Sequence, residues 1–136
     1  MKIAICGSLK FYKQMREAEK SLESMGHKVF IPIEVPGLDY WGKDGKKRVE
    51  AKIKLGLVGK HFDKIEKSDA ILVVNITKKN IKNYIGANTF LEIGYAHYRK
   101  KKIFVLNPLP NQAYIADELL SFNPIVVNGD LSKLNK

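Results

Sequence analysis

The residue best suited to chemistry is Glu92, the one carboxylate in the segment 88–96, NTFLEIGYA. The apolar residues around it recur at helical spacing, which predicts a helix with a partly desolvated carboxylate in its first turns. Burial raises the pKa of such a group, whereas the helix dipole favours its anion. A carboxylate in this setting can act as a nucleophile or a base. The alternative is a Glu92 that points into water and only complements the dipole.

A second candidate is the pair Gly7-Ser8, which follows an aliphatic run and precedes a helical pattern. A glycine allows close approach of a ligand, and a hydroxyl beside free N–H groups at a helix start can hold a phosphate or a sugar. We therefore expect Gly7 and Ser8 to bind substrate. The alternative is a turn that only caps the helix, since neither GxGxxG nor GxxxxGK[ST] is present.

The single cysteine and the three histidines form no metal-binding pattern. Cys6, at the end of the first aliphatic run, is expected to be a small buried hydrophobe rather than a nucleophile or a redox centre. His27, His61 and His97 lie far apart and lack the HExxH or cysteine-pair spacing. The sequence therefore predicts no metal and no organic cofactor.

These residues must be positioned by a series of short aliphatic runs that alternate with amphipathic stretches, a pattern typical of a parallel sheet covered by helices. Strands are expected at 2–6, 27–31, 70–75, 103–106 and 125–127. Helices are expected at 11–25, 46–68, 88–99 and 113–121. Gly56 and Gly59 suggest either a break or a close packing contact partway along the second helix.

Such β-α units predict an α/β fold with one doubly wound, flavodoxin- or Rossmann-like sheet of five parallel strands. The expected strand order is 2-1-3-4-5, with helices on both faces, and residues 1–136 are expected to form a single domain. In a sheet of this kind the ligand lies at the carboxyl ends of the strands, near the point where the strand order reverses. Gly7-Ser8 and the start of the Glu92 helix should meet there.

Composition excludes several other classes of protein. With 45% hydrophobic and 28% charged residues among 136, the chain is neither disordered, collagen-like nor a coiled coil. The net charge of +10 favours anionic partners, but the basic runs are scattered and not interleaved with aromatic residues, so the pattern does not indicate a nucleic-acid ligand. No aliphatic run approaches the ~20 residues of a membrane span. One cysteine and no apparent leader predict a cytoplasmic protein.

The segment NTFLEIGYA, followed by the strand KIFVLN, resembles the T-x-x-E-[IL]-G-x-A signature of the nucleoside 2-deoxyribosyltransferase-like family. The strand ending ICGS and the phrase KIEKSDAILVVN are also similar, so the resemblance extends through Pro108. Members of this family cleave the N-glycosidic bond of 2'-deoxynucleosides and pass the sugar to another base, while relatives hydrolyse nucleoside monophosphates. The family is generally oligomeric, which implies a homodimer or a larger homo-oligomer.

The resemblance implies that Glu92 is a nucleophile that attacks C1' and forms a glycosyl-enzyme ester. The chain departs from the family at Gly86 and Asn88, where the transferases commonly carry Asp and Gly. A second family Asp, eight residues before Asp69, corresponds to His61. His61 is therefore a candidate catalytic proton donor, and the alternative is a histidine on the helix surface.

Further candidates for substrate binding are two amides and an aromatic pair. Asn75 and Asn88 can donate to and accept from a base edge or sugar hydroxyls, although asparagine is also a common turn former. Tyr40 and Trp41, in the long loop 32–45, can stack on a nucleobase or close over it, or can pack against the domain.

The resulting hypothesis is an enzyme that cleaves the N-glycosidic bond of a small-molecule (deoxy)nucleoside or nucleotide through Glu92, with either water or a second base as acceptor. One alternative is a nucleoside 5'-monophosphate N-glycosidase, a hydrolase. The other is a non-catalytic nucleotide-binding module on the same fold, inactive because Gly86 replaces the usual Asp.

Overall fold

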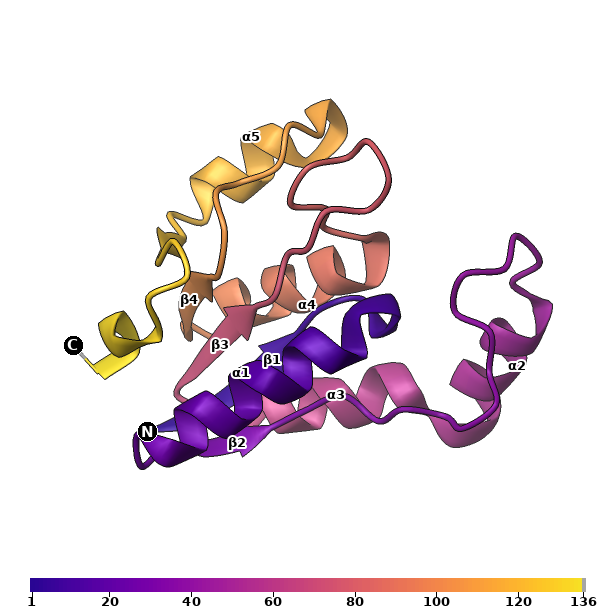
Figure 1. Ribbon diagram of the computed structural model, residues 1–136, viewed down its shortest axis with the longest axis horizontal. Helices are drawn as coiled ribbons and strands as arrows, with labels where there is room; N and C mark the ends of the chain where they lie inside the picture. Colours follow the sequence, from indigo (N-terminus) through magenta and orange to yellow (C-terminus); the bar gives the residue numbers. More distant parts are fainter. Residues whose placement is uncertain (136) are drawn as a thin grey trace.

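The computed structural model describes residues 1–135 and contains a five-stranded sheet of order β2-β1-β3-β4-β5 (Figure 1). All neighbouring strands pair in parallel. The strands are β1 (Lys2–Cys6), β2 (Lys28–Phe30), β3 (Ala70–Val73), β4 (Lys102–Val105) and β5 (Ile125–Val126). The predicted fold class and strand order are confirmed, and the strand order reverses between β1 and β3.

Five α-helices connect or flank the strands: α1 (Tyr12–Ser24), α2 (Lys46–Leu55), α3 (Leu57–Glu66), α4 (Ala87–Tyr98) and α5 (Ala113–Ser121). Short 3-10 helices at Leu9–Phe11 and Leu131–Asn135 precede α1 and end the described chain. The predicted break in helix 46–68 is confirmed at Gly56, which has a φ of 59°. Glycine reaches this left-handed conformation without steric cost, so the chain can turn between α2 and α3.

Helices cover both faces of the sheet because the side chains of each strand alternate between them. Ile3 and Ile5 of β1 pack in one apolar cluster with residues of α1 and of the final 3-10 helix. Ala4 and Cys6, the intervening residues, pack in a second cluster with residues of α3, α4 and α5. Within residues 1–135 no helix combines the length and hydrophobicity that a bilayer-spanning segment needs.

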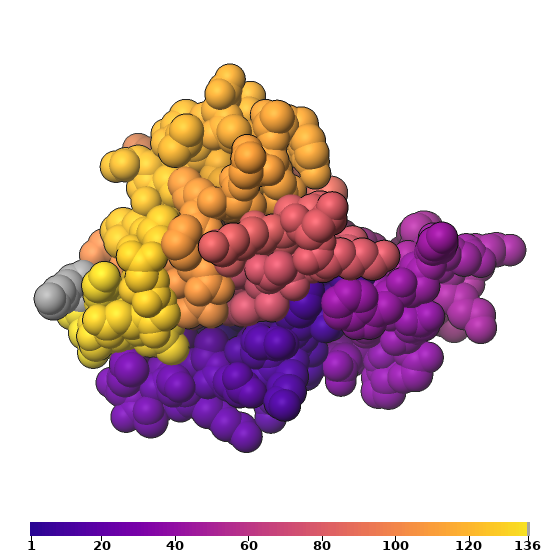
Figure 2. All heavy atoms as spheres, turned by 45° about the horizontal axis from the view of Figure 1, so that its top comes forward, coloured from indigo at the N-terminus to yellow at the C-terminus, as the bar shows by residue number. Residues whose placement is uncertain are grey.

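Helix α2 is the exception to this packing. It contributes no buried residue, and Val49 and Ile53 are more than half exposed. Figures 1 and 2 show α2 and the loop before it projecting from the body, away from both chain termini. The charged side chains of α2 therefore border the cavity described below without joining the core.

Candidate active site

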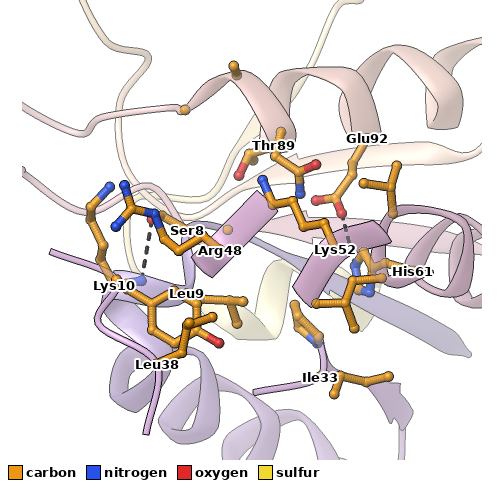
Figure 3. Close-up of a pocket in the computed structure, with 18 of the residues that line it drawn as sticks. Ser8, Leu9, Lys10, Ile33, Leu38, Arg48, Lys52, His61, Thr89 and Glu92 are labelled. Atoms are coloured by element: carbon orange, nitrogen blue, oxygen red, sulfur yellow. Dashed lines mark hydrogen bonds and ion pairs between the residues drawn. The ribbon is translucent and has the colours of Figure 1, made fainter. Parts of the chain in front are cut away.

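A cavity of about 260 Å³ opens where the strand order reverses (Figure 3). Its walls come from residues 7–10 after β1, residues 32–40 after β2 and residues 84–92 after β3, with further side chains from α2 and α3. This is the carboxyl edge of the sheet, at the topological switch point where ligands of doubly wound folds bind. The predicted location of the site and the cavity therefore coincide.

Glu92 lies in this cavity wall on the second turn of α4 and is only 2% exposed. Its Oε1 atom is buried without a hydrogen-bond partner among the described residues. Burial raises the pKa of Glu92 to about 8, although the Cys6 thiol and the Lys52 ammonium act in the opposite direction. The carboxyl group is therefore mostly protonated at neutral pH, and its anion forms as the pH approaches 8.

His61 is also buried, on the inner side of α3, and its Nε2 lies 3.9 Å from Oε2 of Glu92. The alternative of a surface histidine is therefore wrong. Burial and the nearby Lys64 ammonium lower the pKa of His61 to about 4, while the Ile5 backbone acts in the opposite direction. At pH 7 His61 and Glu92 are thus a neutral pair rather than a salt bridge.

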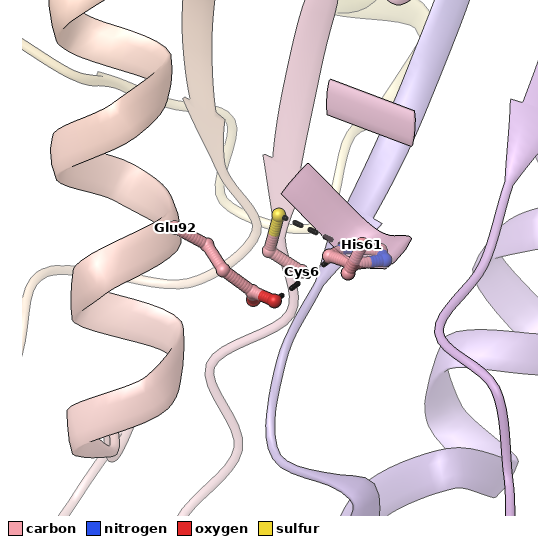
Figure 4. Close-up of side chains that lie close together, drawn as sticks. All are labelled: Cys6, His61 and Glu92. Carbon is pink, nitrogen blue, oxygen red and sulfur yellow. Dashed lines mark hydrogen bonds and ion pairs between the residues drawn. The ribbon is translucent and has the colours of Figure 1, made fainter. Parts of the chain in front are cut away.

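Cys6, the last residue of β1, is the third member of this group (Figure 4). Its Sγ lies 3.6 Å from Nε2 of His61, and burial together with Glu92 raises its thiol pKa well above the usual range. The prediction that Cys6 is buried is confirmed. Its proximity to His61 and Glu92 was not expected from the sequence, because the three residues belong to β1, α3 and α4. We call Cys6, His61 and Glu92 the floor of the site.

Gly7 and Ser8 both line the cavity. A Cβ at Gly7 would lie 3.0 Å from the Val74 carbonyl oxygen, a tight contact that a larger residue could make only if the backbone shifted slightly. The Ser8 hydroxyl accepts from the Lys10 N–H at 3.4 Å and caps the 3-10 helix Leu9–Phe11. The capping role is therefore present, and Ser8 still faces the cavity.

Of the two aromatic candidates, only Tyr40 lines the cavity. Its hydroxyl accepts a hydrogen bond from the Val35 N–H at 3.0 Å, which holds the loop. Trp41 is 54% exposed and is not among the lining residues. Its ring instead meets Phe11 edge to face, with the ring centroids 5.5 Å apart.

The two amide candidates also separate. Asn88 lines the cavity near the start of α4. Asn75 is fully buried and not among the lining residues, since its amide donates to the Asn107 and Pro108 carbonyls and accepts from the Asn107 N–H. These bonds join the loops that follow β3 and β4, so the Asn75 side chain is engaged in holding the fold.

Tyr84 is a cavity residue that the sequence pattern did not reveal. Its hydroxyl lies 3.1 Å from the point where a Cβ at Gly86 would stand, so Tyr84 occupies space next to the position where the transferases commonly carry Asp. The Lys78 ammonium lies over the Tyr84 ring, 4.7 Å from the centroid. The chain therefore places a phenol beside the missing carboxyl group.

A second unexpected feature is a set of three cations, Lys10, Arg48 and Lys52, which line the cavity and which we call the rim. In the part of the chain that the structure describes, none of them forms an ion pair with a carboxylate. Partial burial lowers the pKa of Lys10, and so do Lys78 and the other two rim cations. In Figure 3, Lys10 and Arg48 lie at one end of the cavity and Glu92 and His61 at the other.

The sequence matches no known family model and no curated protein. Two solved structures are similar in fold. One is a 2-deoxyribosyltransferase from Bacillus psychrosaccharolyticus, with a TM-score of 0.58 and 17% identity over 86% of this chain and 81% of that one. The other is the CMP N-glycosidase BcmB of Clostridium botulinum, with a TM-score of 0.56 and 19% identity over 100% of both chains. The chain thus has the fold of the nucleoside 2-deoxyribosyltransferase-like family, as its Glu92 segment predicts.

Proposed function

We propose that this protein is an enzyme that cleaves the N-glycosidic bond of a nucleoside or nucleotide, with Glu92 as the nucleophile. The observation that carries this proposal is a buried carboxyl group facing a cavity at the topological switch point. The EIGYA segment around it and the likeness to a 2-deoxyribosyltransferase and a CMP N-glycosidase support the same chemistry.

In the proposed first step, the ionised carboxylate of Glu92 attacks C1' while the C1'–N bond breaks and its electron pair leaves with the base. The second step is attack on C1' by water or by another base, which releases the carboxylate. Two inversions at C1' give net retention. Because burial raises the pKa of Glu92 to about 8, kcat/KM should rise with pH as this group ionises.

The departing base needs a hydrogen-bond donor or a proton. His61 is a poor source of a proton near pH 7, because its pKa of about 4 keeps the ring neutral. Its Nε2 also faces Glu92. We therefore assign His61 the role of positioning the Glu92 carboxylate. The Tyr84 hydroxyl, which lines the cavity beside Gly86, is the proposed donor to the base.

The rim favours one class of substrate, the nucleoside 5'-monophosphates. Lys10, Arg48 and Lys52 face a cavity without carboxylate partners, and a phosphate carries about −1.5 to −2 charges near pH 7. With the 5'-phosphate near Lys10 and Arg48 and C1' at Glu92, the cavity would hold both the charged end and the reacting carbon of one nucleotide. On this argument the nucleotide N-glycosidase alternative is favoured over a transferase specific for unphosphorylated nucleosides.

The test is chromatographic detection of free base after incubation with a panel of nucleosides and 5'-monophosphates, with and without an acceptor base. Wild-type protein should release base, fastest from a monophosphate, and Glu92→Gln should not. Glu118→Gln makes the same change on an exposed part of α5 and should behave as wild type.

Release of base by Glu92→Gln at the wild-type rate would exclude Glu92 as the nucleophile. If the wild type binds a nucleotide and leaves it intact over the whole panel, the proposed reaction is wrong and the binding-module alternative is correct. Dependence of base release on the acceptor base would identify a transferase rather than a hydrolase.

A further inference from the structure

The floor brings together three side chains of types that bind transition metals. The Cys6 sulfur lies 3.6 Å from Nε2 of His61, which lies 3.9 Å from Oε2 of Glu92, and all three ligand atoms are within 4.8 Å of one another (Figure 4). Each residue comes from a different element of the core, so their approach is a property of the fold rather than of local sequence. A thiol, an imidazole and a carboxyl group are together a donor set suited to zinc.

The spacing of these atoms fits tetrahedral coordination. With Zn–S bonds of about 2.3 Å and Zn–N and Zn–O bonds of about 2.0–2.2 Å, tetrahedral angles place S and N about 3.6 Å apart and N and O about 3.4 Å apart. The observed separations are 3.6 Å for Cys6 and His61 and 3.9 Å for His61 and Glu92. The Cys6 sulfur and the Glu92 oxygen lie within 4.8 Å, against about 3.6 Å for two such ligands of one zinc ion, so the carboxylate would have to move toward the ion.

The floor also contains a polar atom that calls for a partner. Oε1 of Glu92 is buried and makes no hydrogen bond to any described residue. Leaving such an atom unsatisfied is costly, and an ordered water or a bound ion commonly satisfies it. The cavity gives an ion a way in, because His61 and Glu92 both line it.

We propose that Cys6, His61 and Glu92 bind one zinc ion reversibly, with a water in the fourth position on the cavity side. The thiol and the carboxyl group each release one proton to solvent when the ion binds, and His61 coordinates as the neutral imidazole. The thiolate and the carboxylate then balance the two charges of the ion, so the occupied floor is electrically neutral. A net positive charge on the floor would be repelled by nearby cations, since Lys52 and Lys64 are close enough to lower the pKa values of Glu92 and His61.

Zinc binding would occupy the carboxylate that the proposed reaction uses as its nucleophile. The metal-free protein is then the active form, and zinc is an inhibitor that competes with substrate. The coordination itself does not depend on the proposed function, and it is tested by spectroscopy on protein without substrate.

The first experiment titrates metal-free protein with cobalt(II), which occupies zinc sites and shows a thiolate charge-transfer absorption when sulfur is a ligand. Wild type should show this absorption at one ion per chain, and zinc should displace it. Cys6→Ser should lose the absorption and bind zinc at least about 100-fold more weakly, since even residues outside the ligand shell contribute 10–100-fold. His97→Gln, a change at an exposed histidine, should leave the cobalt absorption and the zinc affinity unchanged.

The second measurement needs no variant, and it therefore remains decisive if Cys6→Ser fails to fold. X-ray absorption of wild type loaded with one zinc ion should show one sulfur ligand, and the chain has only one cysteine to supply it. A zinc shell of nitrogen and oxygen alone, or a cobalt spectrum that survives in Cys6→Ser, would overturn the proposal.

A third measurement links the site to activity. If the protein releases base, zinc should inhibit wild type at concentrations that fill the site and inhibit Cys6→Ser only at much higher concentrations, each compared with its own metal-free rate. Equal sensitivity of the two proteins would show that zinc acts elsewhere and would contradict inhibition through the floor. An inactive protein that still binds cobalt through sulfur would refute the proposed function and leave the metal site intact.

Discussion

The floor and the rim of the cavity hold ionisable groups in opposite ways. The floor residues lie on β1, α3 and α4 and are at most 4% exposed, and burial shifts their pKa values so that each is neutral near pH 7. The rim residues come from the short 3-10 helix after β1 and from α2, which has no buried residue. Charged groups cost little there because water still reaches them. Reactive groups are thus tuned by burial, while charges for recognition stay near solvent.

The largest expected effect is on the floor. Glu92→Gln should lower the rate of base release by roughly 10³-fold or more, because an amide cannot replace a carboxylate nucleophile. Intact-mass measurement after acid quenching should also find a glycosyl adduct on wild type and none on the variant. An adduct on Glu92→Gln would show that another residue is the nucleophile.

The rim should affect binding more than chemistry. The double variant Lys10→Met/Arg48→Met should raise KM for a nucleoside 5'-monophosphate by at least about 100-fold, since each hydrogen bond to a charged group contributes about 1.5–3 kcal/mol. KM for the matching nucleoside should stay the same. Steady-state kinetics with both substrates test this, and Lys54→Met on the exposed side of α2 is the matched control. Equal loss with both substrates would contradict phosphate binding by the rim.

Tyr84 lies beside Gly86 in the cavity wall and tests whether chemistry extends beyond the floor. Tyr84→Phe should lower kcat by about 10-fold, because it removes one hydroxyl donor to the departing base and keeps the ring under Lys78. Substrates whose bases leave readily should be affected less than those whose bases leave slowly. An unchanged kcat of Tyr84→Phe with a poorly leaving base would show that Tyr84 does not donate to the departing base.

The smallest effect is on stability and follows from the pKa of Glu92. Its pKa in the folded state, about 8, lies above the ordinary value of 4.5, so the unfolded chain binds fewer protons between these two pH values. The free energy of unfolding should therefore fall as the pH rises from 4.5 to 8, by roughly 1–2 kcal/mol between pH 6.5 and 8. His61 contributes in the opposite sense only between pH 4 and 6.5.

Urea denaturation of wild type and Glu92→Gln at pH 6.5 and 8 measures this difference. Between pH 6.5 and 8 the unfolding free energy of wild type should fall relative to that of Glu92→Gln. A gap that is independent of pH would show that Glu92 is ionised in the folded state throughout, and would contradict a neutral floor.

Most of the fold could be predicted from sequence because its signals are local. Apolar residues at helical spacing marked α1 and α4, aliphatic runs marked β1, β3 and β4, and the alternation of the two implied parallel strands. The break at Gly56 was also visible, since the left-handed conformation favours glycine. The position of Glu92 near the ligand-binding edge of the sheet followed from the same local pattern.

The contents of the site were decided by the tertiary structure. Cys6, His61 and Glu92 are widely separated in sequence, and only the sheet order and the packing of α3 and α4 bring them together. Nothing local marked Asn75 as a link between loops or Trp41 as a neighbour of Phe11.

The sequence by itself thus determined the elements, their order in the sheet and the edge at which Glu92 stands. Tertiary structure decided which side chains meet there and what charge each carries. The physical reason is that periodicity depends on near neighbours in the chain, whereas a pKa depends on how much water and which charges the folded chain leaves around a group. The low pKa of His61 and the high pKa of Glu92 both arise chiefly from burial, which exists only in the folded protein.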